Sequence, residues 1–487
     1  MSPPVTLGPW KAVLLIFSLI VALLSAYKIV SVTRPDEGWS MYVAATSIAW
    51  LLVYFLCSYF QFRTPYLFTS AYIVSLALFH LGITVPHAFG GFEGIGWTNG
   101  PLVKWLDKAG WYTVLSLACL GVGFGFSLTR RRFIVSRDVV SGEDAALAMR
   151  AAFWVGLGLL AAAMVLLAMA IASLGNLLAY QRVDFFRGVG DTRGLGVFLM
   201  VFPSAVLCLV VGARTRRQKL FAFSIALVAL VIVLSSGYRT SALFPLMVGI
   251  ILWVKTGRRI PNVLAAGTVA FVVLAIPVTG IIRSLGPYQD IEKEDIQKAV
   301  ELATVEETFR TLGQTGGVLA QVLRLVPNQD PYRYGSTYVE AVIGSLPNLT
   351  GEIRESKRVE ARRKMRTNVN AISEMVPSDW LTYRIAREKF DTGEGVGFTT
   401  IGEAYLNFGV FGVVAFFGGL GFLLGRLDAI NLLAHPKWII FSTAILWPLM
   451  RTVRDDFANF VKPAVFVLII LLIWRVITII FFPKHRF

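Results

Sequence analysis

The sequence predicts an all-α polytopic membrane protein with about twelve transmembrane helices, and three observations lead to that fold class. The chain has 487 residues, of which 56% are hydrophobic and only 16% charged, whereas soluble domains are about 45–50% apolar and about 25% charged. Apolar runs of about 20 residues, long enough to cross the hydrocarbon core, recur along the chain. Helices are expected because a lipid-facing strand would leave its backbone polar groups unpaired.

A long polar insert interrupts the apolar runs and defines three predicted regions. Residues 1–282 hold the first nine predicted spans, residues 283–396 form a large periplasmic loop with amphipathic helices, and residues 397–487 hold the last three spans. The predicted spans are 11–31, 40–60, 65–83, 110–128, 150–173, 195–213, 219–236, 241–256, 262–282, 397–425, 437–453 and 463–482. The 397–425 run is long enough to be tilted or broken, and Gly402, Gly409 and Gly412 give it places to bend.

Lys and Arg in the short loops predict the orientation, because cytoplasmic loops are enriched in both residues. With twelve spans, the basic clusters fall on one side, together with both termini, and we take that side as cytoplasmic. The same bias explains the net charge of +16 without nucleic acid as a partner. The clusters are Arg130–Arg132, Arg214–Lys219, Lys255–Arg259 and Lys484–Arg486.

Cysteine, histidine and acidic residues give no sign of a metal or a cofactor. Cys57, Cys119 and Cys208 all fall inside apolar runs, so they do not form a disulfide framework. Asp455 and Asp456 are adjacent, and adjacent acids diverge on a helix unless other ligands help them. We therefore expect no metal site and no cofactor.

Two loops on the non-cytoplasmic side place arginines where positive residues are normally depleted. Arg182, Arg187 and Arg193 lie in a glycine-containing loop, and Arg239 follows Tyr238 in a tight reversal before a new helix. A guanidinium matches phosphate oxygens bidentately, and a helix N-terminus adds backbone donors for an anion. The alternatives are Arg–Asp pairs within the first loop and an Arg239 side chain that reaches lipid phosphate.

A carboxylate and two further arginines lie beside apolar helices on the same side. Glu403 stands in the first turns of the 397–425 run, where a carboxylate is costly unless it is paired or functional. It is a candidate base or a ligand for a sugar hydroxyl; the alternative is a structural Glu–Arg pair. Arg451 and Arg454 end the 437–453 run and add cations at that depth.

Three of these segments together resemble the O-antigen and oligosaccharide repeat-unit polymerases of the Wzy-like family. They are the Gly237-Tyr238-Arg239 reversal, the Tyr332-Arg333-Tyr334-Gly335-Ser336-Thr337-Tyr338 element and the Glu403-Ala404-Tyr405-Leu406-Asn407-Phe408-Gly409 segment. The resemblance runs from about residue 174 to 460, and only Arg239 and Glu403 match the family elements directly.

The resemblance implies a metal-independent glycosyltransferase that joins oligosaccharide repeat units carried on undecaprenyl pyrophosphate. The reaction would take place at the outer face of the bacterial inner membrane, with a chain-length regulator and a flippase as further partners. Glu403 and Arg239 are the catalytic candidates. Candidates for binding pyrophosphate or glycan are Arg182, Arg187, Arg193, Tyr238, Tyr334, Tyr338, Tyr405, Arg451 and Arg454.

Two other classes of protein remain as alternatives. The predicted architecture is GT-C-like, and a polyprenyl-phosphate-sugar-dependent GT-C glycosyltransferase has a similar helix number. Such an enzyme often has a catalytic acid in its first outer loop, where Asp36 and Glu37 stand. A flippase or transporter of lipid-linked oligosaccharides is the second alternative. Transporters commonly show repeat symmetry and ionisable residues near the membrane centre, and this chain shows neither pattern.

The predicted topology can be tested by cysteine labelling from outside the cell. A cysteine at Gly351 is expected to react with an impermeant reagent, because it lies in the large outer loop. A cysteine at Gln218 is expected to react only after the membrane is permeabilised. The reverse pattern would overturn the assignment of every candidate site to the outer face.

Overall fold

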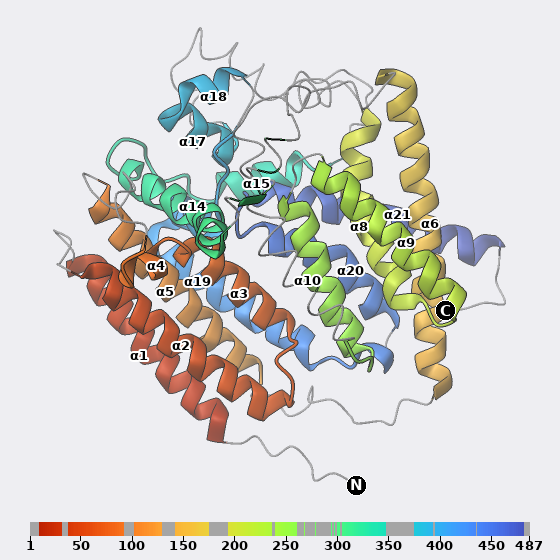
Figure 1. Cartoon of the computed structure of the whole chain (residues 1–487), viewed down its shortest axis with the longest axis horizontal. Helices are drawn as coiled ribbons and strands as arrows, with labels where there is room; N and C mark the ends of the chain where they lie inside the picture. Colours follow the sequence, from red (N-terminus) through yellow and green to blue (C-terminus); the bar gives the residue numbers. More distant parts are fainter. Residues whose placement is uncertain are drawn as a thin grey trace.

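A computed structural model gives the arrangement of the helices (Figure 1). It describes residues 9–31, 38–91, 102–128, 142–174, 193–235, 239–260, 304–346, 375–392, 395–434 and 436–481, with a few isolated positions between 267 and 301. All regular elements in these ranges are helices, which confirms the all-α class.

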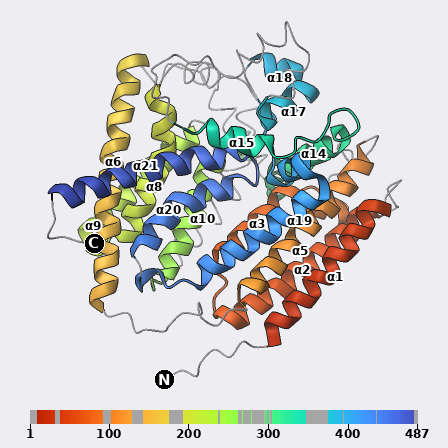
Figure 2. The ribbon, with the colours of Figure 1, turned by 180° about the vertical axis from the view of Figure 1, so that it is seen from behind.

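One group of helices packs side by side around α5, which is almost completely buried (Figures 1 and 2). The helix α19 lies against α5 along its length, and α1, α2 and α3 cover other sides of it. The members are α1 (Pro9–Ser31), α2 (Trp39–Phe62), α3 (Phe68–Leu81), α5 (Val103–Ser127) and α19 (Thr400–Ala429).

A second group surrounds α8 and contacts the first group through α10 and α20. The helices α6 and α8 form the most extensive pairing of this group. The members are α6 (Gly142–Leu174), α8 (Arg193–Gly212), α9 (Arg216–Ser235), α10 (Arg239–Lys255), α20 (Pro436–Arg451) and α21 (Ala458–Phe481).

The structure supports a multi-pass membrane protein, and every predicted span except 262–282 coincides with a helix; that range lies outside the described residues apart from two positions. In the described part, 5 helices are long and apolar enough to cross a membrane. They are Pro9–Ser31, Trp39–Phe62, Val103–Ser127, Ala145–Met169 and Thr400–Ala429. The total of twelve spans and the GT-C-like architecture stay predictions.

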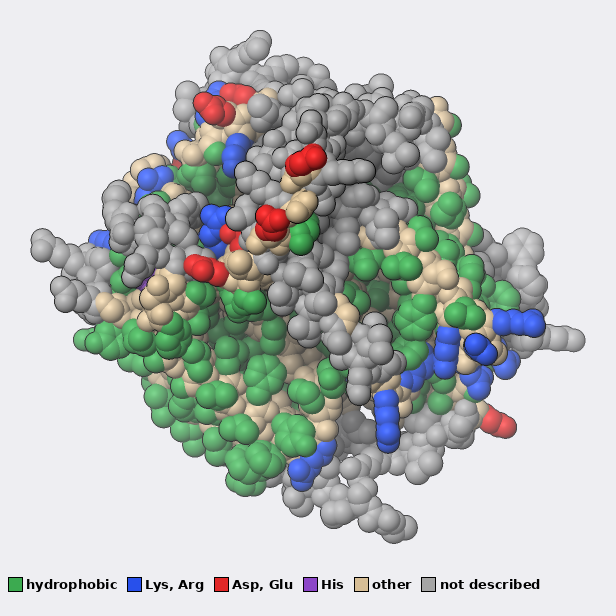
Figure 3. Space-filling view, in the orientation of Figure 1, with side chains coloured by type: hydrophobic (Ala, Val, Ile, Leu, Met, Phe, Trp, Pro, Cys, Tyr) green, Lys and Arg blue, Asp and Glu red, His purple; other side chains and the backbone are tan. Residues whose placement is uncertain are grey.

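The described part of the predicted outer loop forms helices at one end of the molecule (Figure 1). Acidic side chains gather mostly toward this end, where Lys and Arg side chains lie among them, and further Lys and Arg side chains lie at the opposite edge of the same face (Figure 3). The orientation of the termini stays a prediction. The helices are α14 (Val305–Leu325), α15 (Ser336–Ile343), α17 (Pro377–Ile385) and α18 (Arg387–Thr392).

The amphipathic helix α14 lies against α3, α4 (Thr84–Ala88) and α5. Thr304 caps its N-terminus by accepting a hydrogen bond from the backbone of Glu307, which satisfies one of the free N–H groups there. Glycines let the backbones of α14 and α3 touch: a Cβ on Gly316 would stand 2.4 Å from the carbonyl oxygen of His80. The helix α14 therefore holds this part of the outer loop directly against the helix bundle.

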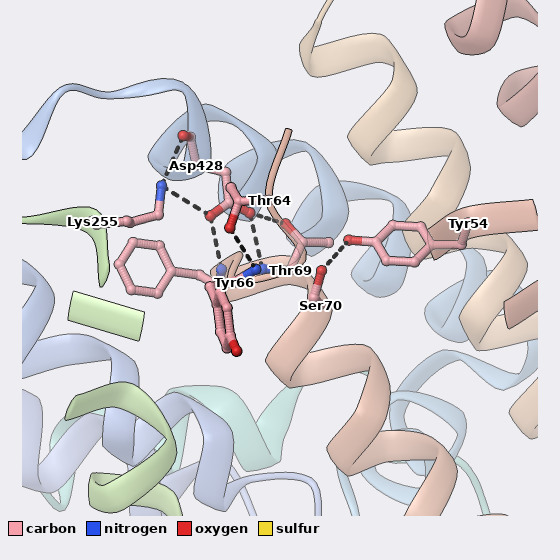
Figure 4. Close-up of polar contacts among 8 residues, drawn as sticks. Tyr54, Thr64, Tyr66, Thr69, Ser70, Lys255 and Asp428 are labelled. Atoms are coloured by element: carbon pink, nitrogen blue, oxygen red, sulfur yellow. Dashed lines mark hydrogen bonds and ion pairs between the residues drawn. The ribbon is translucent and has the colours of Figure 1, made fainter. Parts of the chain in front are cut away.

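At the other end of α19, Asp428 ties three helices together (Figure 4). Its carboxylate accepts hydrogen bonds from the backbone N–H groups of Phe68 (2.8 Å) and Thr69 (3.0 Å), at the N-terminus of α3. The Lys255 ammonium, from the end of α10, lies 3.4 Å from the same carboxylate. A buried carboxylate is well accommodated here because a helix N-terminus and a cation both favour its negative charge.

Because the α14–α3 contact is made by backbone atoms, Gly316→Ala is expected to lower the thermal unfolding midpoint of the purified protein. The added methyl group cannot avoid the His80 carbonyl without moving a helix, and such overpacking costs about 1–3 kcal/mol. Gly419→Ala is the matched control, because a Cβ there meets nothing within 4 Å. A midpoint for Gly316→Ala at or above that of the control would contradict this account of the packing.

Candidate functional site

The candidate site is built at a break in α19. Phe408 (φ −138°, ψ 18°) and Gly409 (φ 61°, ψ −146°) leave the helical conformation, and the positive φ at Gly409 is one that glycine adopts without strain. The break frees carbonyl groups that an unbroken helix would use internally. The backbone N–H of Arg333 donates to the carbonyl of Leu406 (2.9 Å), and that of Tyr334 donates to the carbonyl of Asn407 (3.1 Å).

The buried amide of Asn407 joins the outer loop to the helix. Its Oδ1 accepts a hydrogen bond from the backbone N–H of Gly335 (2.9 Å). Its Nδ2 donates to the hydroxyl of Thr337 (2.7 Å) and to the carbonyl oxygen of Glu403, one turn earlier (2.8 Å). The amide is thus satisfied on both sides, which is the condition for burying it at low cost.

The Glu403 carboxylate lies at the centre of this arrangement, and the residue is only 1% exposed. Its Oε1 accepts a hydrogen bond from the Thr337 hydroxyl (2.8 Å), and its Oε2 accepts one from the backbone N–H of Phe457 (2.6 Å). A carboxylate has about four acceptor positions. The two hydrogen bonds therefore orient Glu403 and leave it further capacity to accept a hydroxyl from a substrate.

The first turn of α19 is fixed by two neighbouring elements. Thr399 caps the helix, and its hydroxyl also lies 2.6 Å from Nε2 of the buried His80. Because Nδ1 of His80 lies 3.1 Å from the carbonyl of Leu76, Nδ1 carries the proton and Nε2 accepts from Thr399. Thr400 donates from both its backbone and its hydroxyl to the carbonyl of Thr452, in the turn after α20.

A second buried carboxylate belongs to Asp456. It is the residue before Phe457, whose backbone N–H donates to Glu403. It accepts hydrogen bonds from the hydroxyl of Ser378 (2.7 Å) and from the side-chain amide of Asn459 (2.9 Å). Burial raises the pKa of Asp456, and the neighbouring Asp455 carboxylate adds to that rise. The site thus holds two buried acids, a combination that general acid–base chemistry uses.

Among the described residues, three arginines lie near the site without forming an ion pair with Glu403. Arg333 donates to the carbonyl of Met375 (2.5 Å) and lies over the ring of Trp380. Burial lowers the pKa of Arg333 to about 10, against the charges of Glu340, Asp330 and Glu403. Arg451 forms an ion pair with Asp455 (2.7 Å), and the guanidinium of Arg454 lies 5.9 Å from the ring centre of Phe79.

Aromatic side chains line the outer surface of the break. The rings of Tyr112, Tyr405 and Tyr332 meet edge to face, with centres 5.2 and 5.8 Å apart. Tyr334 is 76% exposed and adopts a left-handed backbone conformation (φ 47°). Tyr338 contacts Phe457 (5.1 Å between ring centres) on the Glu403 side of the loop. Tyr112 and Tyr405 are buried. The exposed Tyr334 and the half-buried Tyr332 and Tyr338 can offer ring faces or hydroxyl groups to a sugar.

The structure brings together Glu403, Tyr334, Tyr338 and Tyr405 from the predicted set, with Arg451 and Arg454 on the adjoining turn. Glu403 has no Arg partner among the ion pairs of the described residues. Arg193 and Arg239 begin α8 and α10, but only their backbones are described. Arg182, Arg187, Tyr238, Asp36 and Glu37 lie outside the described residues.

Sequence reasoning did not find the residues that orient Glu403. Asn407 stands four positions after Glu403 and therefore on the same helix face, which is a signal that the spacing offered. Thr337 lies inside the tyrosine-rich element, but nothing in that element shows which side chain it meets. The sequence raised Asp456 only as a metal ligand. In the part of the chain that the structure describes, no three His, Cys, Asp or Glu side chains cluster in a way that would hold a metal.

The fold and the site together define a class of protein: a multi-pass helical membrane protein with a buried acid and a group of tyrosines, Tyr334 among them exposed, at one end of its bundle. The chain belongs to the O-antigen polysaccharide polymerase Wzy family, whose family model matches residues 12–484. Neither the curated proteins nor the solved structures contain a match. Family membership makes the chain a membrane-bound polysaccharide polymerase that acts on lipid-linked oligosaccharide repeat units, and it confirms the resemblance found in the sequence.

Asn407→Asp is expected to destabilise the site, because it replaces two hydrogen-bond donors with an oxygen facing the Glu403 carbonyl. A buried group left without its partner costs about 1–3 kcal/mol, which should appear as a lower unfolding midpoint and as less polymer. The matched control is Asn328→Asp, an exposed amide that donates to the carbonyl of Arg324. Equal stability of the two variants would show that Asn407 does not hold the loop to the helix.

Proposed function

We propose that this protein polymerises repeat units carried on undecaprenyl pyrophosphate, at the outer face of the bacterial inner membrane. A hydroxyl of one lipid-linked unit attacks the anomeric carbon of a second unit. A new glycosidic bond forms, the bond to undecaprenyl pyrophosphate breaks, and the hydroxyl proton passes to a base.

The observation that carries this proposal is the contact between two segments far apart in the sequence. Residues 332–338 and 403–409 are two of the three segments that carry the resemblance to the polymerases, and they bind one another through Asn407 and Thr337 around Glu403. Because both hydrogen bonds of the Glu403 carboxylate come from protein, its position is fixed before a substrate arrives. This arrangement supports a role for Glu403 in orienting the attacking hydroxyl and accepting its proton.

The departing pyrophosphate needs positive charge at the same depth. Stabilising the charge that develops on a leaving group is commonly the largest single contribution to catalysis. We assign this role to Arg239, with Arg182, Arg187, Arg193, Arg451 and Arg454 as further ligands of the pyrophosphate. Tyr238, Tyr334, Tyr338 and Tyr405 are proposed to contact the glycan. The assignment of Arg239 is supported by its position as the first residue of α10, where backbone N–H groups also favour an anion.

For Arg239, the Lys variant is expected to be nearly as defective as the Ala variant. A lysine restores the charge but not the bidentate geometry that matches pyrophosphate oxygens. Losing this contact should cost about 2–4 kcal/mol, or roughly 10²–10³ in rate. The measurement is the length distribution of the glycan ladder on a gel, normalised to the amount of protein. Full-length ladders from Arg239→Ala would remove this residue from the site.

Glu403→Gln is expected to abolish most polymerisation while preserving the fold. The Thr337 hydroxyl can accept a hydrogen bond from the side-chain amide of the glutamine. The amide oxygen can still accept from the backbone N–H of Phe457, so a hydrogen bond replaces each of the two that Glu403 makes. What is lost is the negative charge. The defect should leave single repeat units on their carrier, because assembly of the unit itself is unaffected.

The comparison variant changes Asp36 to Asn and Glu37 to Gln together, and it separates the polymerase from a GT-C glycosyltransferase. In a polymerase these acids lie in a loop that only connects two helices. The double substitution should then cost little activity, as surface substitutions usually cost little stability. Both variants are made in a strain that lacks the native protein. An active Glu403→Gln protein together with an inactive Asp36/Glu37 double variant would favour the glycosyltransferase.

A further inference from the structure

Helix α15 in the outer loop exposes an apolar face and buries the opposite one, which is the reverse of what is expected for a helix in water. Val339, Val342 and Ile343 are 58%, 50% and 59% exposed, and their spacing places them on one face of the helix. The opposite face buries Thr337 and Ala341. A helix bathed in water normally buries its apolar stripe and exposes its polar one.

The place where α15 contacts α19 indicates the depth of α15 relative to the hydrocarbon core. Tyr338 stacks on Phe416 of α19, with 6.4 Å between the ring centres. Beyond the break, α19 continues from Val410 to Ala429, which at about 1.5 Å per residue matches the roughly 30 Å of the hydrocarbon core. On the same scale Phe416 lies about 9 Å along the axis from Val410. Taking Val410–Ala429 as the segment that crosses the hydrocarbon core places the contact between Tyr338 and Phe416 within that core.

The helix α19 also exposes apolar side chains to its surroundings. Phe411 is 81% exposed, and Val414 is exposed on the following turn. The ring of Phe408 lies against Gly335, the residue that caps α15. The helix α15 thus packs against a candidate membrane span whose own exposed side chains include large apolar ones.

We propose that α15 lies inside the bilayer, in the leaflet at the Glu403 end, with Val339, Val342 and Ile343 facing the acyl chains of membrane lipids. The helix is too short to cross the membrane. Its neighbouring backbone is satisfied by protein: Gly335 donates to Asn407, and Gly344 donates to the carbonyl of Glu340. Non-spanning backbone is tolerated at membrane depth where protein packs around it.

This placement has a consequence for access to the site, which rests on the proposed function. The inner face of α15 carries Thr337, which donates to Glu403, while its outer face contacts lipid. A substrate whose carrier chain lies in the same leaflet then approaches Glu403 sideways, from the bilayer. The placement of α15 itself depends only on the contacts with α19 and on the exposed stripe.

The test uses fluorescence quenching of the full-length protein in proteoliposomes. Single cysteines are placed at Val342 and Ile343, in a background where Cys57, Cys119 and Cys208 are alanine, and labelled with bimane. Phe411→Cys is the lipid-facing control on α19, and Glu388→Cys, at an exposed position of α18, is the water-facing control. Each sample is titrated with a lipid that carries a nitroxide on its acyl chain and, separately, with iodide in water.

The expected result is that the nitroxide lipid quenches the Val342 and Ile343 labels as strongly as the Phe411 label, while iodide quenches only the Glu388 label. Iodide quenching at Val342 and Ile343 would overturn the proposal, because the stripe would then face water. Protection from both quenchers would also overturn it, because protein would then cover the stripe. No glycan is measured, so this outcome is independent of whether the proposed reaction is correct.

Discussion

The break in α19 at Phe408 and Gly409 is the feature on which the site depends. A helix interrupted near the membrane leaves carbonyl groups that must find donors, because unpaired backbone groups are costly away from water. The donors come from Arg333 and Tyr334, more than seventy positions earlier in the chain. The same exchange brings Asn407 and Thr337 into contact, and Thr337 in turn holds Glu403. The chemistry of the site thus follows from completing one helix with one loop.

Both ends of α19 are held by buried polar contacts, which keeps this helix in register with the rest of the bundle. At the Glu403 end, Thr399 and Thr400 bond to His80 and to the turn after α20. At the far end, Asp428 bonds to the start of α3 and to Lys255 (Figure 4). Such buried polar groups stabilise only when all their partners are present. They therefore fix one arrangement of α19, because shifting the helix by a turn would leave groups unpaired at both ends.

The sequence was sufficient for the fold class and for the central residue of the site, but not for the contacts around that residue. Hydrophobic runs of membrane length predict spanning helices because the bilayer allows few other structures. Glu403 was identifiable because a carboxylate in an apolar helix needs a reason. The bend was also foreseen, with Gly409 one of three candidate positions. The pairing of Asn407 with Gly335 and Thr337 depends on how a long loop folds back, and no local pattern encodes that. The same limit applies to α15, whose short apolar stripe does not reach the length of a span.

Among the described residues, Glu403 is oriented by neutral donors and forms no ion pair with an arginine. If an arginine were paired with Glu403, the carboxylate would be neutralised. Here Thr337 and the backbone of Phe457 orient the carboxylate with neutral donors, while Arg333 is held by a backbone carbonyl and Arg451 by Asp455. Neutral donors cost less to desolvate than ions, so they fix the acid without consuming its charge. In the proposed reaction, that charge would be available to the hydroxyl of the substrate.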